Sequence, residues 1–410
     1  MIQRTIYKKI LNSIKNYPIT LITGARKVGK TTLCKELAKD MNFNYVTLAD
    51  IRNRSLAISD PMMFLKLNPC PLIIDDVEYA PGLFDCIESI VNKQKFEEKN
   101  NHGMFVLSSN HNFKFLEGVT QSMAGRVSII NMSPLSVSEI NNVEENPFSI
   151  DIMQVSKRTK DYKIDINNLF KHIVDGMYPE LYDNPSLDKN EFYSNYVDTY
   201  INKDVTSIIN VADKLKFQNF MEVLASLTGE QLVYDSIAKA CGVSMPTIKS
   251  WVSVLMAGDI IYLLESYNEM SAIKRVSRKY KIYFKDTGLA AYLARLNDPE
   301  ILKRSRFAGS FVETYIINEI MKSYLNNNVK PNFYYYRDND QKEIDLVILD
   351  KGKIDFIECK TGTRFNASDL KGFNALANKT KYEIGGKCII CNTEGIYKID
   401  DTLVLPITAI

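Results

Sequence analysis

The sequence reads Gly24-Ala25-Arg26-Lys27-Val28-Gly29-Lys30-Thr31-Thr32 after an apolar run, ITLIT (19–23), and before a helical run, LCKELAKD (33–40). It fits G-x-x-x-x-G-K-[ST], the pattern of a phosphate-binding loop, or P-loop, between a strand and a helix. Glycines let backbone N–H groups turn toward phosphate oxygens, and the helix N-terminus adds partial positive charge. The stretch therefore predicts a loop that binds ATP, with Lys30 at the β- and γ-phosphates and the Thr31 hydroxyl on Mg²⁺.

Short β-branched runs alternate with helical stretches around this loop. Such alternation is typical of an α/β fold in which crossover helices connect the strands of a parallel sheet. We expect this P-loop fold over residues 1–145, with a boundary in the polar, proline-containing segment 141–154. The expected strands are ITLIT (19–23), NYVTLA (44–49), PLIID (71–75), MFVLSS (104–109) and VSIIN (127–131).

Asp75 and Asp76 end an apolar run in the way that a Walker B element of an ATPase does. Because such a strand is buried and its end projects into the phosphate site, we expect Asp75 to hold Mg²⁺, directly or through water. Asp76 stands where many such ATPases carry a Glu that activates the attacking water, and Glu78 is a weaker candidate for this role. The alternative is that Asp75 and Asp76 only cap the end of the strand and have no catalytic role.

Polar residues also end the run MFVLSSN (104–110). At the tip of a strand beside the Walker B strand, Asn110 or Ser109 could bind the γ-phosphate or the lytic water, as the sensor residue of AAA+ proteins does. Arg126 precedes the last run and could contact the γ-phosphate of the same or a neighbouring subunit, as an arginine finger does. A helix-end arginine on a solvated face is the alternative for Arg126.

Composition restricts the class of protein. The 410 residues exceed a usual single domain, the net charge is +2, and the seven cysteines are scattered. These features favour several domains in a reducing compartment over a disulfide framework. Neither a signal-peptide pattern nor a run of about 18 apolar residues is visible, so we expect a cytoplasmic protein with no membrane partner.

Several stretches together resemble one family of bacterial and archaeal proteins, the AAA-family ATPases with a C-terminal domain of the DUF4143 type. The similarity extends over about residues 3 to 365 and implies ATP binding, although its later motifs imply no known activity. The sequence departs from the family at Asp76 for Glu, at Glu78 for Gln, and at Ser108-Ser109-Asn110 for Thr-Gly-Ser. The similarity rests on GARKVGKTTL (24–33), LIIDDVEYAPGLF (72–84), LSSN (107–110), SMAGRVSIINMSPLSVSEI (122–140), DGMYPELY (175–182), residues 196–229 and YFKDTGLAAYL (283–293).

Residues 232–267 predict a helix-turn-helix that continues into a wing, within a mostly helical domain at 160–300. Gly242 permits the turn, and Ser244 is a good N-cap for the second helix. Thr247 and Lys249 lie outside the inward stripe of that helix, where a recognition helix meets DNA. Such folds also serve as protein-binding modules. The wing contains the basic residues Lys274, Arg275, Arg278, Lys279 and Lys281, which favour contact with DNA phosphates.

A restriction-endonuclease-like α/β domain is predicted over residues 301–410. If the runs around Asp345 and Glu358 form a hairpin that turns at Lys351-Gly352, these two carboxylates face each other, and Lys360 shares their face. Two carboxylates and a lysine suit metal-dependent phosphodiester cleavage, and Glu313 on the preceding helix could add a third carboxylate. A surface hairpin with alternating charges is the alternative.

Three functional hypotheses follow from these motifs. The first is an Mg²⁺-dependent ATPase that acts as a motor or switch on DNA, with ATP and Mg²⁺ as cofactors and DNA as partner. The second is a metal-dependent DNA nuclease gated by ATP. The third is a non-enzymatic switch in which the winged helix binds a protein. Homo-oligomers fit the first hypothesis, because Arg126 could act on a neighbouring subunit.

Overall fold

The computed structural model describes residues 2–98, 101–110, 125–158, 166–205, 214–268, 279–330, 332–363 and 370–410, which form two compact units. The N-terminal unit contains Met1–Leu135 and two short later segments, Tyr178–Glu180 and Ala257–Asp259. The C-terminal unit contains the rest, namely Ser136–Met177, Leu181–Met256 and Ile260–Ile410.

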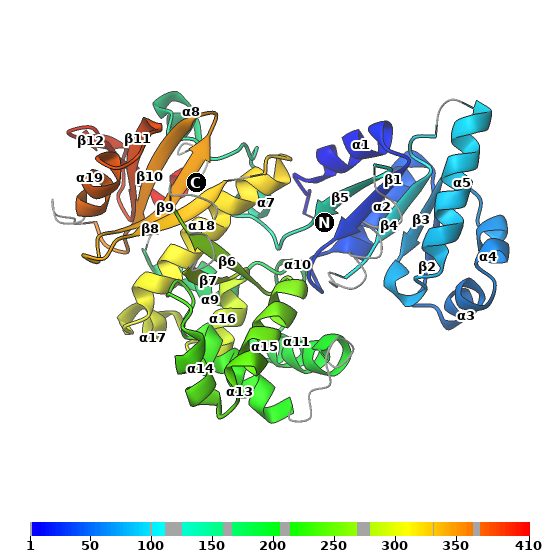
Figure 1. Ribbon diagram of the computed structural model, residues 1–410, viewed down its shortest axis with the longest axis horizontal. Coiled ribbons are helices and arrows are strands. Elements are labelled where there is room, and N and C mark those ends of the chain that lie inside the picture. Colours follow the sequence, from blue (N-terminus) through cyan, green and yellow to red (C-terminus); the bar gives the residue numbers. More distant parts are fainter. Residues whose placement is uncertain are drawn as a thin grey trace. The chain divides into compact units, whose positions relative to one another are not determined.

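The N-terminal unit is built on a parallel sheet with the strand order β2-β3-β4-β1-β5 (Figure 1). The strands are β1 (Ile19–Thr23), β2 (Asn44–Thr47), β3 (Leu72–Asp75), β4 (Phe105–Ser108) and β5 (Val127–Asn131). Its helices are α1 (Tyr7–Asn16), α2 (Lys30–Met41), α3 (Ile51–Ser59), α4 (Pro61–Leu67), the 3₁₀ turn η1 (Val77–Tyr79) and α5 (Leu83–Glu98). Every run expected to form a strand does so, which confirms the predicted parallel α/β fold.

The central strands β1, β3 and β4 are buried along their whole length. Continuous apolar runs are typical of parallel strands that are covered on both faces. Leu83 and Ile87 of α5 share one hydrophobic core with Leu21 of β1 and Ile74 of β3. Because the strands are parallel, their carboxyl ends meet at one edge of the sheet, and the P-loop and Walker B residues follow from that edge.

The C-terminal unit contains a mixed sheet with the order β12-β13-β11-β10-β9-β8-β6-β7 (Figure 1). Antiparallel pairs join β6 to β7, β8 to β9 and β9 to β10, whereas β10, β11 and β13 run parallel. The strands are β6 (Ile261–Ser266), β7 (Tyr280–Phe284), β8 (Phe333–Arg337), β9 (Glu343–Asp350), β10 (Lys353–Cys359), β11 (Glu383–Cys391), β12 (Tyr397–Ile399) and β13 (Thr402–Pro406).

Helices precede and accompany this sheet. They are α7 (Val137–Ile140), α8 (Ile152–Arg158), α9 (Ile166–Asp175), α10 (Pro179–Asp183), α11 (Lys189–Thr199), the π-helix η2 (Tyr200–Val205), α13 (Lys214–Ala225), α14 (Tyr234–Cys241), α15 (Met245–Ala257), α16 (Thr287–Leu293), α17 (Pro299–Arg304), α18 (Ala308–Asn326), α19 (Lys371–Ala377) and the 3₁₀ turn η5 (Ile407–Ala409). The expected helix-turn-helix is present as α14 and α15, joined through Gly242 at a φ of 63°. The Ser244 hydroxyl accepts a hydrogen bond from the backbone N–H of Thr247, as an N-cap does.

The strands expected to flank a wing, β6 and β7, belong to the same sheet as the nuclease-like hairpin. β6 pairs in parallel with β8, with Glu265 opposite Tyr334 and Ser266 opposite Tyr335. The domain boundary predicted near residue 300 therefore falls inside one compact unit.

The buried carboxylate of Asp286 connects the motifs DGMYPELY and YFKDTGLAAYL through hydrogen bonds. Both carboxylate oxygens of Asp286 accept backbone hydrogen bonds, Oδ2 from Met177 at 2.7 Å and Oδ1 from Leu289 at 2.7 Å. The Tyr193 hydroxyl donates to Asp286 Oδ1 at 2.9 Å. A Cβ atom added at Gly288 would lie 2.7 Å from the backbone of Gly176. The DGMYPELY and FKDTG motifs are thus explained by close packing.

Gly288→Ala is expected to destabilise the C-terminal unit by about 3 kcal/mol, because the added methyl group overpacks the contact with Gly176 and Tyr193. Trp251, the single tryptophan of the chain, is buried in this unit against Phe217 and Phe220. Its fluorescence during urea unfolding therefore reports on this unit. Gly309→Ala is the matched control, since a Cβ there meets nothing within 4 Å. Equal urea midpoints for the two variants would contradict the packing argument.

Candidate functional site

The P-loop connects β1 to α2 and is shaped by two glycines. Gly24 has a φ of 149°, and a Cβ at this position would collide with the Met132 carbonyl oxygen. Gly29 has a φ of 97° and forms the N-cap of α2 without a side-chain cap. The first backbone N–H groups of α2 therefore face the loop without a capping side chain, which is the arrangement that binds anions.

Arg4 braces this loop and was not among the residues singled out from sequence. Its guanidinium donates to the Val28 carbonyl at 2.7 Å and to the Ser133 carbonyl at 2.7 Å, and the side chain is buried. Arg4 thus fixes the P-loop to the chain that leaves β5. No local motif marks this role, because its two partners lie 24 and 129 residues away in the sequence.

Lys30 is 6% exposed, and its ammonium lies among oxygen atoms. It donates to the Gly24 carbonyl at 2.9 Å, to the Ala25 carbonyl at 2.7 Å and to Asn110 Oδ1 at 3.0 Å. Burial lowers the pKa of Lys30 to about 8, although nearby Glu78 and Asp76 act in the opposite direction. Within the described part of the chain its hydrogen-bond acceptors are neutral oxygens, whereas the carboxylates of Glu78 and Asp76 act on it through space.

Asp75 ends β3 and is 1% exposed. Its Oδ2 accepts from the Tyr45 hydroxyl at 2.9 Å, and its Oδ1 accepts from the Ser108 hydroxyl. β4 lies between β3 and β1, as expected for a sensor strand. Thr31 is exposed in the first turn of α2. Carboxylate and hydroxyl oxygens are ligands that suit Mg²⁺, which usually takes one or two protein carboxylates together with substrate phosphates.

Asp76 adopts a left-handed backbone conformation with a φ of 58° and immediately precedes η1. Its N–H donates to the Ser108 hydroxyl at 3.3 Å. Burial and the neighbouring charge of Asp75 raise the pKa of Asp76, which makes this carboxylate a stronger base than an ordinary aspartate.

Glu78 and Asn110 form a short chain of contacts with Lys30. Glu78 Oε1 accepts from Asn110 Nδ2 at 2.7 Å and from the Asn110 backbone N–H at 3.3 Å. The amide of Asn110 thus points its oxygen at the Lys30 cation and its nitrogen at the Glu78 carboxylate. Burial raises the pKa of Glu78, and its Oε2 is buried without a hydrogen-bond partner in the described ranges.

Of the two sensor candidates, Asn110 is the one that contacts Lys30. The Ser109 hydroxyl instead donates to the Asn110 carbonyl at 2.8 Å.

The other side chains of the P-loop differ from one another in their exposure to solvent. Ala25 and Val28 are buried in the core, Arg26 is half-buried, and Lys27 and Thr32 are exposed.

Arg126 lies at the opposite end of the sheet from the P-loop. Its carbonyl accepts from the N–H of Ile19, the first residue of β1, whereas the P-loop follows the last residue, Thr23. These ends are roughly 13 Å apart at 3.3 Å per residue. Its guanidinium binds Glu88 at 3.1 Å and Asn92 at 2.9 Å. The prediction of a phosphate contact within the same subunit is therefore wrong, and the contact with a neighbouring subunit stays a prediction.

The hairpin predicted around Asp345 and Glu358 forms with the expected register. Lys351 and Gly352 turn with φ values of 47° and 81°, and Asp350 pairs with Lys353 through to Leu346 with Ile357. Asp345 Oδ2 accepts from the Cys359 N–H at 2.9 Å, and Lys360 lies 2.9 Å from Glu358.

The carboxylates of this hairpin lie in a buried environment. Burial, together with the charge of Asp345, raises the pKa of Glu358 to about 9. The same two causes raise the pKa of Glu313 on α18 to about 8. Glu313 also accepts from the Tyr283 hydroxyl at 2.6 Å. The four residues predicted from sequence are thus gathered in one place.

Lys281, expected on an exposed basic wing, belongs to this carboxylate cluster instead. It is 3% exposed and binds Glu313 at 2.8 Å and Glu343 at 2.6 Å. The expectation was wrong because Lys281 lies within β7, a strand that is buried from Lys281 to Phe284. Burial alone would lower the pKa of Lys281, but Glu313, Asp345 and Glu343 raise it well above its usual value.

The residues predicted to contact DNA are only partly described. Lys249 is exposed on α15, with its ammonium 5.7 Å from the centre of the Tyr234 ring. Thr247 is half-buried, with its hydroxyl 2.8 Å from that of Ser244, and Lys279 is exposed. The remaining basic residues of the wing, Lys274, Arg275 and Arg278, lie outside the described residues.

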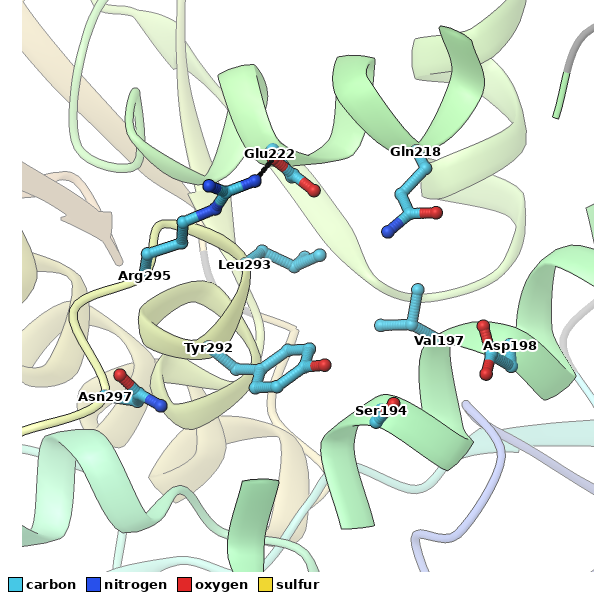
Figure 2. A pocket seen from close by; sticks show the side chains of 9 residues that line it. All are labelled: Ser194, Val197, Asp198, Gln218, Glu222, Tyr292, Leu293, Arg295 and Asn297. Atoms are coloured by element: carbon cyan, nitrogen blue, oxygen red, sulfur yellow. Dashed lines mark hydrogen bonds and ion pairs between the residues drawn. The ribbon is translucent and has the colours of Figure 1, made fainter. Parts of the chain in front are cut away.

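A cavity of about 310 Å³ lies between α11, α13, α16 and the segment that follows α16. Arg295 and Glu222 lie 3.2 Å apart and form an ion pair at one side of it, drawn as a dashed line in Figure 2. No residue predicted from sequence to form a site lines this cavity, and its volume is at the lower limit for ligand pockets. Its lining residues are Ser194, Val197, Asp198, Gln218, Glu222, Tyr292, Leu293, Arg295 and Asn297.

Family models match three parts of the chain. They are an AAA domain over residues 16–141, a domain of unknown function (DUF8612) over 166–300, and another (DUF4143) over 308–410. The chain carries an AAA domain and a DUF4143 domain. The family resemblance seen in the sequence is thereby confirmed.

Two relatives match most of the chain at low sequence identity. Uncharacterized proteins of Mycobacterium bovis and Mycobacterium tuberculosis are each 20% identical over 354 residues, which make up 86% of this chain and 72% of the relative. The Walker-type ATPase of Pyrococcus abyssi is 12% identical, with 70% of this chain and 94% of that chain covered and a TM-score of 0.42. A RuvB variant of Thermotoga maritima is 13% identical, with 64% and 89% covered and a TM-score of 0.32.

The AAA domain comprises the β1–β5 sheet and the P-loop, and the DUF4143 domain comprises α18 and the strands from β8 onward. Where the structure describes the chain, no helix is both long and apolar enough to cross a bilayer.

Proposed function

We propose that the AAA domain binds ATP together with Mg²⁺ and hydrolyses it. The buried ammonium of Lys30 carries this proposal, because its hydrogen-bond partners in the described ranges are neutral oxygens. A buried cation of this kind is stabilised by a negatively charged ligand. The uncapped N-terminus of α2 adds a second preference for anions at the same place.

Thr31 and Asp75 would hold Mg²⁺, which neutralises phosphate charge when bound. Asp76 accepts the proton of the attacking water while the water oxygen bonds to the γ-phosphorus and the bond to the β-phosphate oxygen breaks. The raised pKa of Asp76 suits this role. Asn110 orients the γ-phosphate or the water, and Glu78 holds the Asn110 amide in place through two hydrogen bonds.

The proposal is tested by calorimetric titration of the full chain with ATP and Mg²⁺, followed by measurement of phosphate release. We expect binding at a single site and slow turnover. A chain that binds no ATP in the presence of Mg²⁺ contradicts the proposal at its first step.

We further propose that the helix-turn-helix contacts DNA phosphates and that the nucleotide state regulates this contact. Support comes from α15, whose first turn contains no acidic residue and whose Lys249 is exposed. An exposed lysine and a helix N-terminus both favour phosphate. In this arrangement Arg126 could complete the ATP site of a neighbouring copy, as a homo-oligomer on DNA would allow.

Lys249→Glu is expected to weaken duplex DNA binding about tenfold at low salt and to reduce the slope of log affinity against log salt by about one. The reason is that one phosphate contact is lost and a repulsive charge is introduced. Fluorescence anisotropy with labelled DNA at several salt concentrations measures both quantities. Lys398→Glu, on an exposed position of β12, is the control. Wild-type protein that binds no DNA at low salt would favour a protein ligand for this module.

A further inference from the structure

The ammonium of Lys281 lies where the carboxylates of the nuclease-like cluster converge. It is 2.8 Å from Glu313 Oε1, 2.6 Å from Glu343 Oε1 and 3.6 Å from Asp345 Oδ1. These carboxylates come from two elements, α18 and β9, while Lys281 comes from β7. The lysine therefore enters the cluster from a third element and binds carboxylates from both of the others.

Other cations balance the rest of the cluster. Arg337 lies 3.3 Å from Glu343 Oε2, and Lys360 lies 2.9 Å from Glu358 Oε1. Each of the four carboxylates thus has a cationic partner within 4 Å. The Lys281 side chain is 4% exposed, so its charge is shielded little by water and depends on these carboxylates.

A divalent ion and this ammonium would compete for the same oxygens. Divalent ions such as Mg²⁺ and Ca²⁺ bind oxygen ligands at about 2.0–2.6 Å, and Mg²⁺ usually takes one or two protein carboxylates among them. Across the described residues, no set of three or more His, Cys, Asp or Glu side chains is placed to hold a metal ion. In the described residues, the Glu358 Oε2 atom of this cluster is buried and has no hydrogen-bond partner.

We propose that the Lys281 ammonium takes the place of a divalent metal ion in the DUF4143 domain, so that this cluster is an internal ion-pair centre and not a metal-dependent nuclease site. The cluster then fastens β7 to α18 and β9. We therefore expect no cleavage of DNA at this cluster.

Manganese titration of the nucleotide-free full chain, followed by electron paramagnetic resonance, tests this proposal. We expect no binding that depends on Asp345 or Glu358 in the wild type. Lys281→Met removes the charge and keeps most of the volume, and we expect it to bind one Mn²⁺ at least about tenfold more tightly than the wild type. Adding Glu358→Gln should abolish that gain. Lys353→Met, which removes an exposed lysine paired with Glu383 on the same sheet, is the matched control.

Trp251 fluorescence shows whether each variant is folded. If Lys281→Met does not fold, Mn²⁺ binding to the wild-type protein is the deciding measurement. Mn²⁺ binding to the wild type that Asp345→Asn abolishes and Asp75→Asn leaves intact would overturn the proposal, and its absence supports it. A folded Lys281→Met variant that gains no Mn²⁺ site would also overturn it. Cleavage of labelled DNA by the wild type with Mn²⁺ that is lost in Glu358→Gln would do the same.

Discussion

Lys30→Ala is expected to weaken ATP binding on the order of 100-fold, equivalent to about 2.7 kcal/mol, and to remove measurable hydrolysis. The variant deletes a buried cation whose hydrogen-bond partners are the Gly24 and Ala25 carbonyls and Asn110. Charge-assisted hydrogen bonds to phosphate are among the strongest polar contacts in proteins. Isothermal titration with ATP and Mg²⁺ measures the change.

Two further variants make this result specific. Lys35→Ala removes an exposed lysine one turn further along α2 and should bind ATP as the wild type does. Lys30→Met keeps the bulk of the side chain, so a loss of binding in both Lys30 variants points to charge and not to a cavity. Circular dichroism spectra of the variants check that each of them remains folded. ATP affinity within about threefold of wild type in Lys30→Ala would contradict the assignment of this loop.

Asp76→Asn is expected to lower the rate of ATP hydrolysis about 100-fold or more while leaving ATP affinity nearly unchanged. General bases contribute roughly 10²–10⁴-fold to rate, and the amide has the size of the carboxylate but cannot accept the proton. Single-turnover release of labelled phosphate, measured beside equilibrium ATP binding, separates the two effects.

The matched comparison is Glu78→Gln. Its amide oxygen can still accept the hydrogen bonds from Asn110, so this variant should lose much less activity than Asp76→Asn. The reverse order of activities would show that Glu78 is the base and that Asp76 only shapes the turn at the end of β3. Equal and small effects in both would exclude either carboxylate from proton transfer.

Local patterns predicted a large part of this structure. The P-loop was recognised because its chemistry, strand and helix are contiguous. The register of the β9–β10 hairpin followed from its two-residue turn, since the turn fixes which residues of the two strands are paired. The meeting of Asp75, Asp76 and Asn110 followed from the parallel order of the strands.

Features that depend on distant contacts were not predictable in this way. Arg4 reaches the P-loop from the start of the chain, and no motif marks it. Lys281 was assigned to an exposed wing, because a cluster of basic residues in sequence gives no information on which of them points inward. Arg126 was placed near a phosphate because it precedes a strand, although it lies at the edge of the sheet where the strands begin.

The pairing of β6 with β8 makes the regions 166–300 and 308–410 thermodynamically interdependent. Separating the two regions would leave an unpaired strand edge. It would also remove the Lys281 ammonium from its ion pairs with Glu313 and Glu343. Breaking a buried ion pair by removing one partner typically costs 3–5 kcal/mol, a large share of the stability of a domain. The two regions thus share one sheet and one buried ion-pair cluster, so we expect them to unfold together.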